Sequence, residues 1–313
     1  MDTDRSAAIN ADIETICNHL TERTATLFLG AGINAGLRNN SNDEFPLGLE
    51  LSRWIARDLL KTPELNMSLD DCAEMARFRL GPKVVNDYIF EKFSAFKPGV
   101  AHLALVQLPW DAIYTTNYDL LVETASQHSA ITAAGIIRQV FSAEENLNSF
   151  SEEEIPYYKL HGSADYANTE AGRLILTRED YRFYETHRRP LFSRLRKDIL
   201  SKTFVFIGYS LSDDNFRAIL EDCKTELEAV SFPLSFAVKR SFTPTERAFW
   251  REKYNIQLIE ADAAEFLDQL KNTWIAESFS VVPLLKRKAS EYLTVDEATT
   301  RFQKVADSFY LVP

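Results

Sequence analysis

The stretch from Thr24 to Asn34 (TATLFLGAGIN) constrains the fold more than any other part of the chain. Its first half, Thr24 to Leu29, is uncharged and β-prone, which is typical of a strand buried on both faces. The chain then turns at Gly30-Ala31-Gly32, where backbone N–H groups can approach a phosphate and a following helix N-terminus would favour negative charge. The stretch therefore predicts a strand, a tight turn and a helix that can hold an anion, with a plain strand–helix turn as the alternative.

Strand-like runs alternate with helix-like stretches along most of the chain. We expect strands at residues 24–29, 111–115, 156–160, 174–177, 203–207, 234–238 and 256–260. Buried β-runs that alternate with helices predict an α/β fold, a doubly wound parallel Rossmann-like sheet. Residues 46–107 have helical spacing throughout and predict an inserted helical subdomain.

The alternation ends near residue 280, which divides the chain into a catalytic domain at 1–280 and a helical tail at 281–313. Within the tail, Val295 to Tyr310 has an apolar stripe at helical spacing. Such a stripe needs burial, either against its own domain or against another chain. We therefore expect the tail to act as an oligomer contact or a linker.

Charge and cysteine content exclude several function classes. The net charge of −11 disfavours direct nucleic-acid binding and an anionic membrane surface. The three cysteines are far apart and form no C-x-x-C pair, so we expect neither a disulfide framework nor a metal site. No apolar signal region or run of about 20 apolar residues is present, and we expect a cytoplasmic protein.

Four polar clusters each follow a predicted strand directly. They are Gly30-Ala31-Gly32, Thr116-Asn117-Tyr118-Asp119, His161-Gly162 and Gly208-Tyr209-Ser210. In parallel sheets, ligands bind at the carboxyl ends of the strands. Any one cluster alone would fit a turn, but four at equivalent ends predict a shared pocket.

In their order and rough spacing, these clusters resemble the motifs of the sirtuin-like NAD-binding family. That family has Gly-Ala-Gly-x-Ser, Gln-Asn-x-Asp, His-Gly and Gly-Thr-Ser-Leu. The corresponding segments here are residues 30–34, 116–119, 161–162 and 208–211, within a resemblance that runs from Thr24 to Asp262. Asn34, Thr116 and Tyr209 replace the family's Ser, Gln and Thr.

A second departure is the absence of the four-cysteine zinc module of deacylase sirtuins. The segment from Gly208 to Asn215, Gly-x-Ser-Leu-x-Asp-x-Asn, looks like the bacterial sirtuin-like branch of anti-phage defence systems. Members of that branch hydrolyse NAD, often as oligomers or beside a protein that senses infection. The resemblance implies an NAD+ glycohydrolase that depletes NAD in defence, with NAD as substrate and without a metal.

The resemblance also suggests roles for individual residues. Asn117 would position the ribose and the water, and His161 would act as general base or bind a ribose hydroxyl. The expected NAD-binding residues are Gly30, Ala31 and Gly32 at the pyrophosphate, Gly208 and Ser210 at the adenosine ribose, Asp119 at the nicotinamide end, Asp262 at the adenine, and Asn34, Thr116 and Tyr209 beside them. Helix capping is the alternative role of Asp119 and Asp262. We expect His102, His128 and His187 to be ordinary residues.

Two other functions stay open. One is an NAD-dependent protein deacylase, which the missing zinc module disfavours. The other is a non-catalytic nucleotide-binding module that signals by its conformation, which the presence of both Asn117 and His161 disfavours. The expected partners are NAD and a homo-oligomer, a sensor protein or a sensor domain, since a constitutive NAD hydrolase would poison its own cell.

Overall fold

The computed structural model describes residues 2–128, 135–140, 150–151, 153–170, 172–211, 213–227 and 231–279. The predicted tail, including Val295 to Tyr310, lies outside these residues. One parallel sheet of seven strands organises the described chain, in the order β3-β4-β2-β1-β5-β6-β7. The strands are β1 (Ala25–Leu29), β2 (Ala112–Thr115), β3 (Ile136–Val140), β4 (Glu154–Lys159), β5 (Thr203–Ile207), β6 (Ser235–Lys239) and β7 (Ile256–Glu260). The predicted α/β class and the doubly wound parallel sheet are confirmed.

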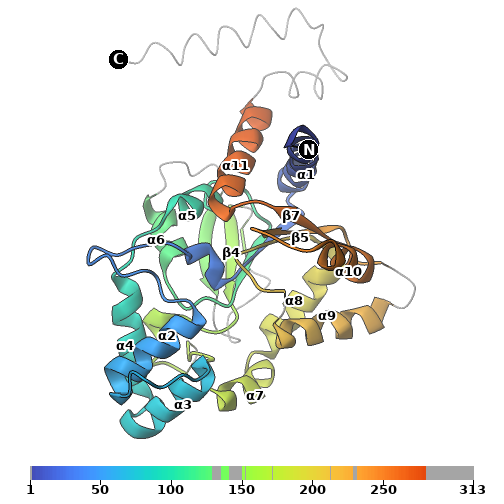
Figure 1. Cartoon of the computed structure of the whole chain (residues 1–313). Helices are drawn as coiled ribbons and strands as arrows, with labels where there is room; N and C mark the ends of the chain where they lie inside the picture. Colours follow the sequence, from blue (N-terminus) through green and yellow to red (C-terminus); the bar gives the residue numbers. More distant parts are fainter. Residues whose placement is uncertain are drawn as a thin grey trace, which may run out of the picture.

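Helices cover both faces of the sheet (Figure 1). One face packs on α1 (Asp2–Thr21), α5 (Val100–Leu105), α6 (Leu121–His128) and α11 (Ala263–Phe279). The other face packs on α8 (Arg189–Ser201), α9 (Asp214–Leu227) and α10 (Pro244–Tyr254). Because side chains alternate along a strand, Leu27 and Leu29 enter the first core while Phe28 enters the second.

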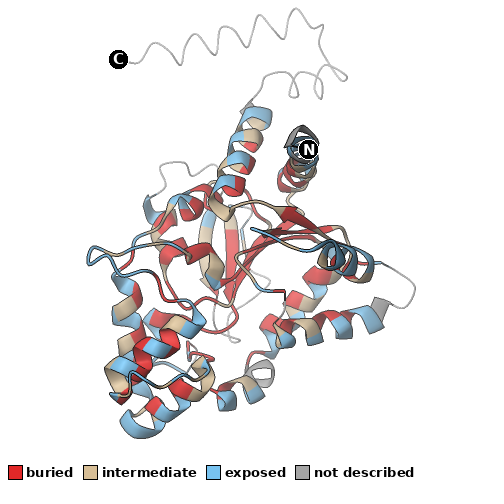
Figure 2. Ribbon diagram, in the orientation of Figure 1, coloured by how far each residue is buried: buried red, intermediate tan, exposed pale blue. Residues whose placement is uncertain are grey.

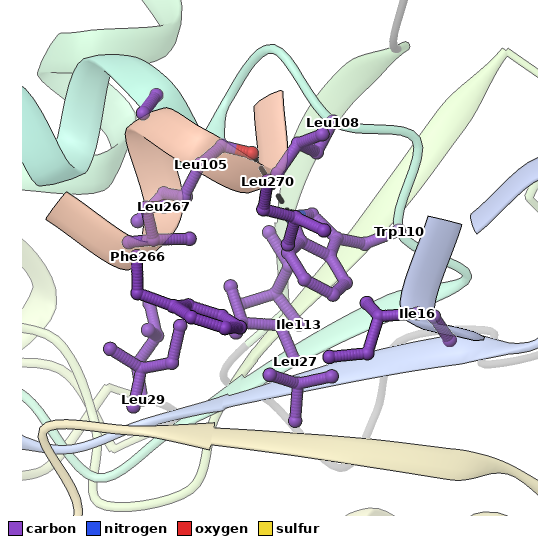
Figure 3. Packing of buried hydrophobic residues seen from close by; sticks show 14 of the residues in the cluster. Ile16, Leu27, Leu29, Leu105, Leu108, Trp110, Ile113, Phe266, Leu267 and Leu270 are labelled. Carbon is purple, nitrogen blue, oxygen red and sulfur yellow. Dashed lines mark hydrogen bonds between the residues drawn. The ribbon is translucent and has the colours of Figure 1, made fainter. Parts of the chain in front are cut away.

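The core beneath α11 shows why the strands form uncharged runs. Leu27, Leu29 and Ile113 point from the sheet toward Phe266, Leu267 and Leu270 of α11 (Figure 3). Trp110 fills the space between them and satisfies its indole N–H by donating to the carbonyl of Leu105 at 3.0 Å. In Figure 2 the buried residues form continuous bands along the strands and the inner sides of the helices.

A third core lies in the helices that follow the first strand. These are α2 (Gly48–Ile55), the π-helical turn η2 (Ala56–Leu60), α3 (Leu69–Leu80) and α4 (Pro82–Ser94). Their core also takes in Tyr118, Leu121 and Ala164, which follow β2 and β4, so the helices pack beside the carboxyl ends of those strands. α5 lies inside the predicted block 46–107, yet it packs on the sheet with α6 and α11, and this range therefore spans two packing units.

Local structure differs from expectation at three places. Residues 174–177 form no strand, because Asp180 accepts the N–H groups of Leu176 and Thr177 while the carbonyl of His161 accepts that of Ile175. The turn after β1 leads not into an α-helix but into the four-residue 3-10 helix η1 (Ala31–Asn34). Strand β3 was not expected, because it is a partly exposed edge strand without an apolar run. Within the described ranges, no helix is both long and apolar enough to cross a membrane.

Candidate active site

The four polar clusters lie side by side at one edge of the sheet. β4, β2, β1 and β5 are consecutive strands, and Leu29 of β1 is in register with both Thr115 of β2 and Ile207 of β5. Thr115 is in turn in register with Lys159 of β4. The residues that follow these positions therefore leave the sheet at the same level, so the four clusters lie at equivalent strand ends, where the shared pocket is predicted.

The glycines of the first and fourth clusters pack backbone against backbone. The N–H of Gly32 donates to the carbonyl of Gly208 at 2.8 Å, and that of Gly30 donates to Ile207 at 3.1 Å. A Cβ on Gly32 would lie 2.7 Å from the Gly208 carbonyl oxygen, and one on Gly208 would lie 2.1 Å from the nitrogen of Ile33. Gly208 also has φ +64°, where a side chain is strained. The glycines thus allow the β1 and β5 loops to touch, and Ala31 is the exposed residue of the turn.

Asn34 is fully buried and joins two parts of the chain through its side-chain amide. Its Nδ2 donates to Asp119 Oδ2 at 2.8 Å, and its Oδ1 accepts from His102 Nε2 at 2.9 Å. Asp119 Oδ1 also accepts the N–H of Leu121 at 3.0 Å and so caps the start of α6. Asn34 and Asp119 therefore support the β2 loop from within the protein.

Asn117 differs from Asn34 in having an uncommitted side chain. The residue is only 7% exposed, and its backbone N–H donates to Thr115 Oγ1 at 3.0 Å. Its side-chain amide has no hydrogen-bond partner among the described residues. Buried amides are normally hydrogen-bonded, so this amide is available to a ligand.

His161 lies two residues after the end of β4 and is buried beside an aromatic ring. Its imidazole lies edge-on to Tyr181, with ring centroids 5.4 Å apart. Burial lowers the pKa of His161 to about 4; the charge of Asp213 acts against this shift, and that of Arg188 adds to it. The imidazole is therefore neutral near pH 7 and can accept a proton.

Two buried cations hold the end of β4 in place. Arg188 is 5% exposed, and its Nη1 donates to the carbonyls of Lys159 and Leu160 at 3.0 Å. Lys159 Nζ donates to the carbonyl of Asp119 at 2.5 Å and to Glu123 Oε1 at 2.8 Å. The ends of β2 and β4, which bear Asn117 and His161, are thus tied together by charged hydrogen bonds.

The remaining predicted residues lie around this centre. Thr116 is half-buried, Ser210 is exposed, and the ring of Tyr209 packs on Phe28 with centroids 4.5 Å apart. Asp262 lies farther along the edge, after β7, where its Oδ1 caps α11 through the N–H of Ala264 and its Oδ2 accepts from Arg240 Nε at 3.2 Å. The capping alternatives proposed for Asp119 and Asp262 are thus both present in the structure.

Several residues of the site were not among the predicted site residues, although Asp213 is part of the motif from Gly208 to Asn215. His102, expected to be ordinary, contacts Asn34, while Tyr181, Arg188 and Asp213 surround His161. Arg188 lies in a run of basic residues from His187 to Lys197, a pattern that favours a solvated helix face, with a partner or anion contact as the alternative.

Comparison with known proteins finds similarity over the part of the chain that forms the sheet. A family model described as a SIR2-like domain matches residues 111–259. An "NAD(+) hydrolase ThsA" of Acinetobacter baumannii (strain 532279) is 28% identical over 224 residues, 69% of this chain and 42% of that protein. A "Defense-associated sirtuin 2" of Bacillus subtilis is 30% identical over 191 residues, 59% of this chain and 18% of that protein.

A distant structural likeness, with 16% identity and a TM-score of 0.45, covers 85% of this chain and 95% of a chain in a solved Sir2 homologue–NAD complex. The chain spans less than half the length of the two curated relatives. The family model covers β2 through β7, and the ThsA and sirtuin 2 similarities extend over most of the chain. Residues 111–259 thus match a SIR2-like domain, and the chain is similar to proteins named NAD(+) hydrolase ThsA over about two thirds of its length.

Proposed function

We propose that the chain is an NAD+ glycohydrolase that cleaves NAD to nicotinamide and ADP-ribose and depletes NAD in bacterial anti-phage defence. The observation that carries this proposal is the pairing of Asn117 and His161. Each lies two residues beyond the register pair Thr115–Lys159, one with an uncommitted amide and the other with a neutral imidazole. The names of the relatives, NAD(+) hydrolase and defence-associated sirtuin, support the same activity.

Cleavage of the nicotinamide–ribose bond requires little covalent participation by the protein. Nicotinamide is a good leaving group, and the ribose develops oxocarbenium character as the glycosidic bond breaks. The Asn117 amide bonds a ribose hydroxyl or orients the attacking water, and His161 takes the proton that the water or hydroxyl releases. Asp213, whose charge raises the pKa of His161, stabilises the imidazolium once it forms.

The substrate is proposed to lie along the edge formed by the loops after β2, β1 and β5. The N–H groups of Gly30 and Gly32 already bond β5, so in this proposal the pyrophosphate meets the turn at the exposed Ala31. Gly208, Tyr209 and Ser210 flank the adenosine ribose. Asp262 lines a cavity of about 410 Å³ with Arg240, which is the proposed place of the adenine.

Asn34, Thr116 and Asp119 complete the proposed binding set. Asn34 acts through Asp119, because both ends of its amide are bonded inside the protein. Thr116 and Asp119 border Asn117 on the β2 loop, where Asp119 is the proposed neighbour of the nicotinamide end.

The reaction is proposed to need no metal and to occur in the cytoplasm under the control of a homo-oligomer or a sensor. Among the described residues, no group of three or more His, Cys, Asp or Glu side chains is arranged to hold a metal ion. Elemental analysis that finds one tightly bound zinc per chain would contradict the metal-free proposal.

The deciding experiment measures nicotinamide released from NAD by the purified chain, with NAD binding followed in parallel by calorimetry. His161→Ala should lower release by about 10²–10⁴-fold, the range for removal of a general base. The matched control is His128→Ala, since His128 is exposed on α6. NAD binding without release would favour the non-catalytic module, and NAD-dependent cleavage of an acyl-lysine peptide would favour the deacylase.

A further inference from the structure

His102 lies outside every motif, yet it makes a buried contact behind the candidate site. It is the third residue of α5, only 1% exposed, and 68 residues from its partner Asn34 in sequence. A buried histidine must satisfy both ring nitrogens, and the partners of the two nitrogens determine which one carries the proton.

Gly99, His102, Asn34 and Asp119 form a chain of hydrogen bonds in which each group donates to the next. The N–H of Gly99 donates to His102 Nδ1 at 3.3 Å, so the neutral ring carries its proton on Nε2. Nε2 then donates to Asn34 Oδ1, and Asn34 Nδ2 donates to Asp119 Oδ2. Burial also lowers the pKa of His102, while the charge of Asp119 acts against this shift, and both the bonds and the burial fit a neutral ring.

Asn34 is held in one of its two amide orientations by this arrangement. A flipped amide would place its NH₂ group against the Nε2–H of His102 and its oxygen against the Asp119 carboxylate. Both contacts would be repulsive in a region without exposed surface, where an unpaired polar group costs about 1–3 kcal/mol. Because His102 carries its proton on Nε2, the NH₂ group of Asn34, and not its oxygen, faces Asp119.

Asp119 passes this constraint to the loop that carries Asn117. Its second oxygen holds the N–H of Leu121, and its carbonyl accepts from Lys159. Asn117 lies two residues before Asp119 and has no side-chain hydrogen bond of its own among the described residues. The position of the Asn117 amide thus depends on how firmly the loop around it is held.

We propose that His102 is a positioning residue for the reaction: through Asn34 it orients Asp119 and fixes the loop that presents Asn117 to the substrate. The inference rests on the proposed glycohydrolase activity for its kinetic consequence. Its structural part, the coupling of His102 to the β2 loop, is independent of that activity.

The test compares two replacements of His102 that differ in one hydrogen bond. His102→Leu removes the donor at similar volume, whereas His102→Gln places an amide N–H near the position of Nε2. His102→Leu should lower kcat for nicotinamide release by about 10–100-fold, the loss expected from misplacement on the order of 1 Å, with KM for NAD changed by less than about threefold. His102→Gln should recover most of the loss.

A double variant separates positioning from general destabilisation. If His102 acts through Asn34, His102→Leu should lower kcat little further in an Asn34→Ala background. Ser235→Ala is the matched control, because Ser235 is buried, accepts the N–H of Phe204 at 3.1 Å and lies at the opposite end of the sheet. It should lower the melting temperature and leave kcat unchanged.

Hydrogen exchange of residues 116–121 makes the test independent of catalysis. His102→Leu should speed exchange of this segment, and His102→Gln and Ser235→Ala should not. Unchanged exchange and unchanged kcat in His102→Leu would overturn the inference. A wild-type chain that neither bound NAD nor released nicotinamide would overturn the proposed function instead, and the exchange result would still decide the coupling.

Discussion

The two sides of the candidate site are built by different means. On the β1–β5 side, Gly32 and Gly208 bring two loops into direct backbone contact, and no side chain comes between them. On the β2–β4 side, Lys159, Arg188 and Asp119 join the loops through buried charged and polar hydrogen bonds. The first side is a steric fit, whereas the second depends on hydrogen bonds between buried polar and charged groups.

In the proposed function, this difference separates the two tasks of NAD cleavage. In the proposed function, the pyrophosphate meets the β1–β5 side at the exposed Ala31, because the N–H groups of Gly30 and Gly32 are already bonded. The β2–β4 side must hold an amide and an imidazole in a fixed geometry at low dielectric, where hydrogen bonds are strong but unpaired groups are costly. Substitutions on one side should therefore fail through added volume, and those on the other through lost partners.

The largest effect should follow loss of the buried ammonium on the β2–β4 side. Lys159→Met would leave Glu123, whose other carboxylate oxygen already lacks a partner among the described residues, without its cation. Breaking a buried ion pair costs about 3–5 kcal/mol, so the free energy of unfolding in urea should fall by that amount.

The double variant Lys159→Met/Glu123→Leu should recover at least half of that loss, because no unpaired charge remains. The exposed pair Lys83–Asp87 serves as the control, and Lys83→Met should leave the urea midpoint nearly unchanged. Losses that simply add in the double variant would show that the ion pair is not what ties the two strand ends together.

On the β1–β5 side, Gly208→Ala should act through volume and backbone strain. The added Cβ would meet the nitrogen of Ile33 at 2.1 Å, at a residue with φ +64°. Strain and overpacking together predict a loss of about 2–4 kcal/mol in unfolding free energy and weaker NAD binding by calorimetry.

Gly36→Ala is the matched control for Gly208→Ala. Gly36 also has positive φ, at +82°, but a Cβ there has no atom within 4 Å. It should therefore cost only about 1 kcal/mol, the strain alone. Equal losses in the two variants would mean that backbone conformation, and not contact between the loops, accounts for Gly208.

The third prediction concerns turnover. Asn117→Ala removes an amide that bonds nothing else in the described chain, so the fold should keep its stability. Loss of one preorganised group that acts in the transition state should lower kcat by about 10²–10³-fold, while NAD affinity, which we propose comes largely from the β1–β5 side, should stay within about threefold. Asn272→Ala, an exposed amide on α11, is the control. NAD binding lost in parallel with turnover would make Asn117 a substrate-holding residue.

The sequence predicts the β1–β5 side of the candidate site better than the β2–β4 side. The uncharged strands and the glycine turns are local signals, and the strand–helix alternation from β5 to α11 follows periodicity closely. Residues 174–177 mislead, because their apolar side chains suit a strand while their N–H groups bond His161 and Asp180. Whether a backbone donor meets another strand or a side chain is decided by tertiary contacts.

For the same reason, the sequence does not predict which buried polar groups bond one another on the β2–β4 side. Asn34 and Asp119 are 85 residues apart in sequence, and Arg188 reaches back 29 residues to Lys159. Sequence spacing identifies residues that follow strands, such as Asn117 and His161, since parallel strands end at one edge. It has no means to show that His102, on a helix between strands, points toward that edge.

The smallest expected effect is a pH dependence of the unfolding free energy that comes from His161, on the β2–β4 side, and not from the β1–β5 side. Burial lowers the pKa of His161 to about 4, whereas the unfolded chain binds this proton near pH 6.5, so acid favours unfolding. Stability should be level above about pH 6.5, fall as the pH drops toward 4, and lose nothing more from this residue below that. Relative to pH 7.5, His161→Gln should lose on the order of 1–2 kcal/mol less than wild type at pH 5. Urea midpoints at both pH values provide the measurement, and carboxylates that titrate in both proteins cancel in the comparison.

Gly32→Ala, on the β1–β5 side, changes no titratable group and should keep the wild-type pH dependence even where it lowers stability. If His161→Gln and Gly32→Ala gave parallel pH profiles, the pKa of His161 would not be lowered in the native state, and burial of the imidazole would not have the electrostatic cost inferred here.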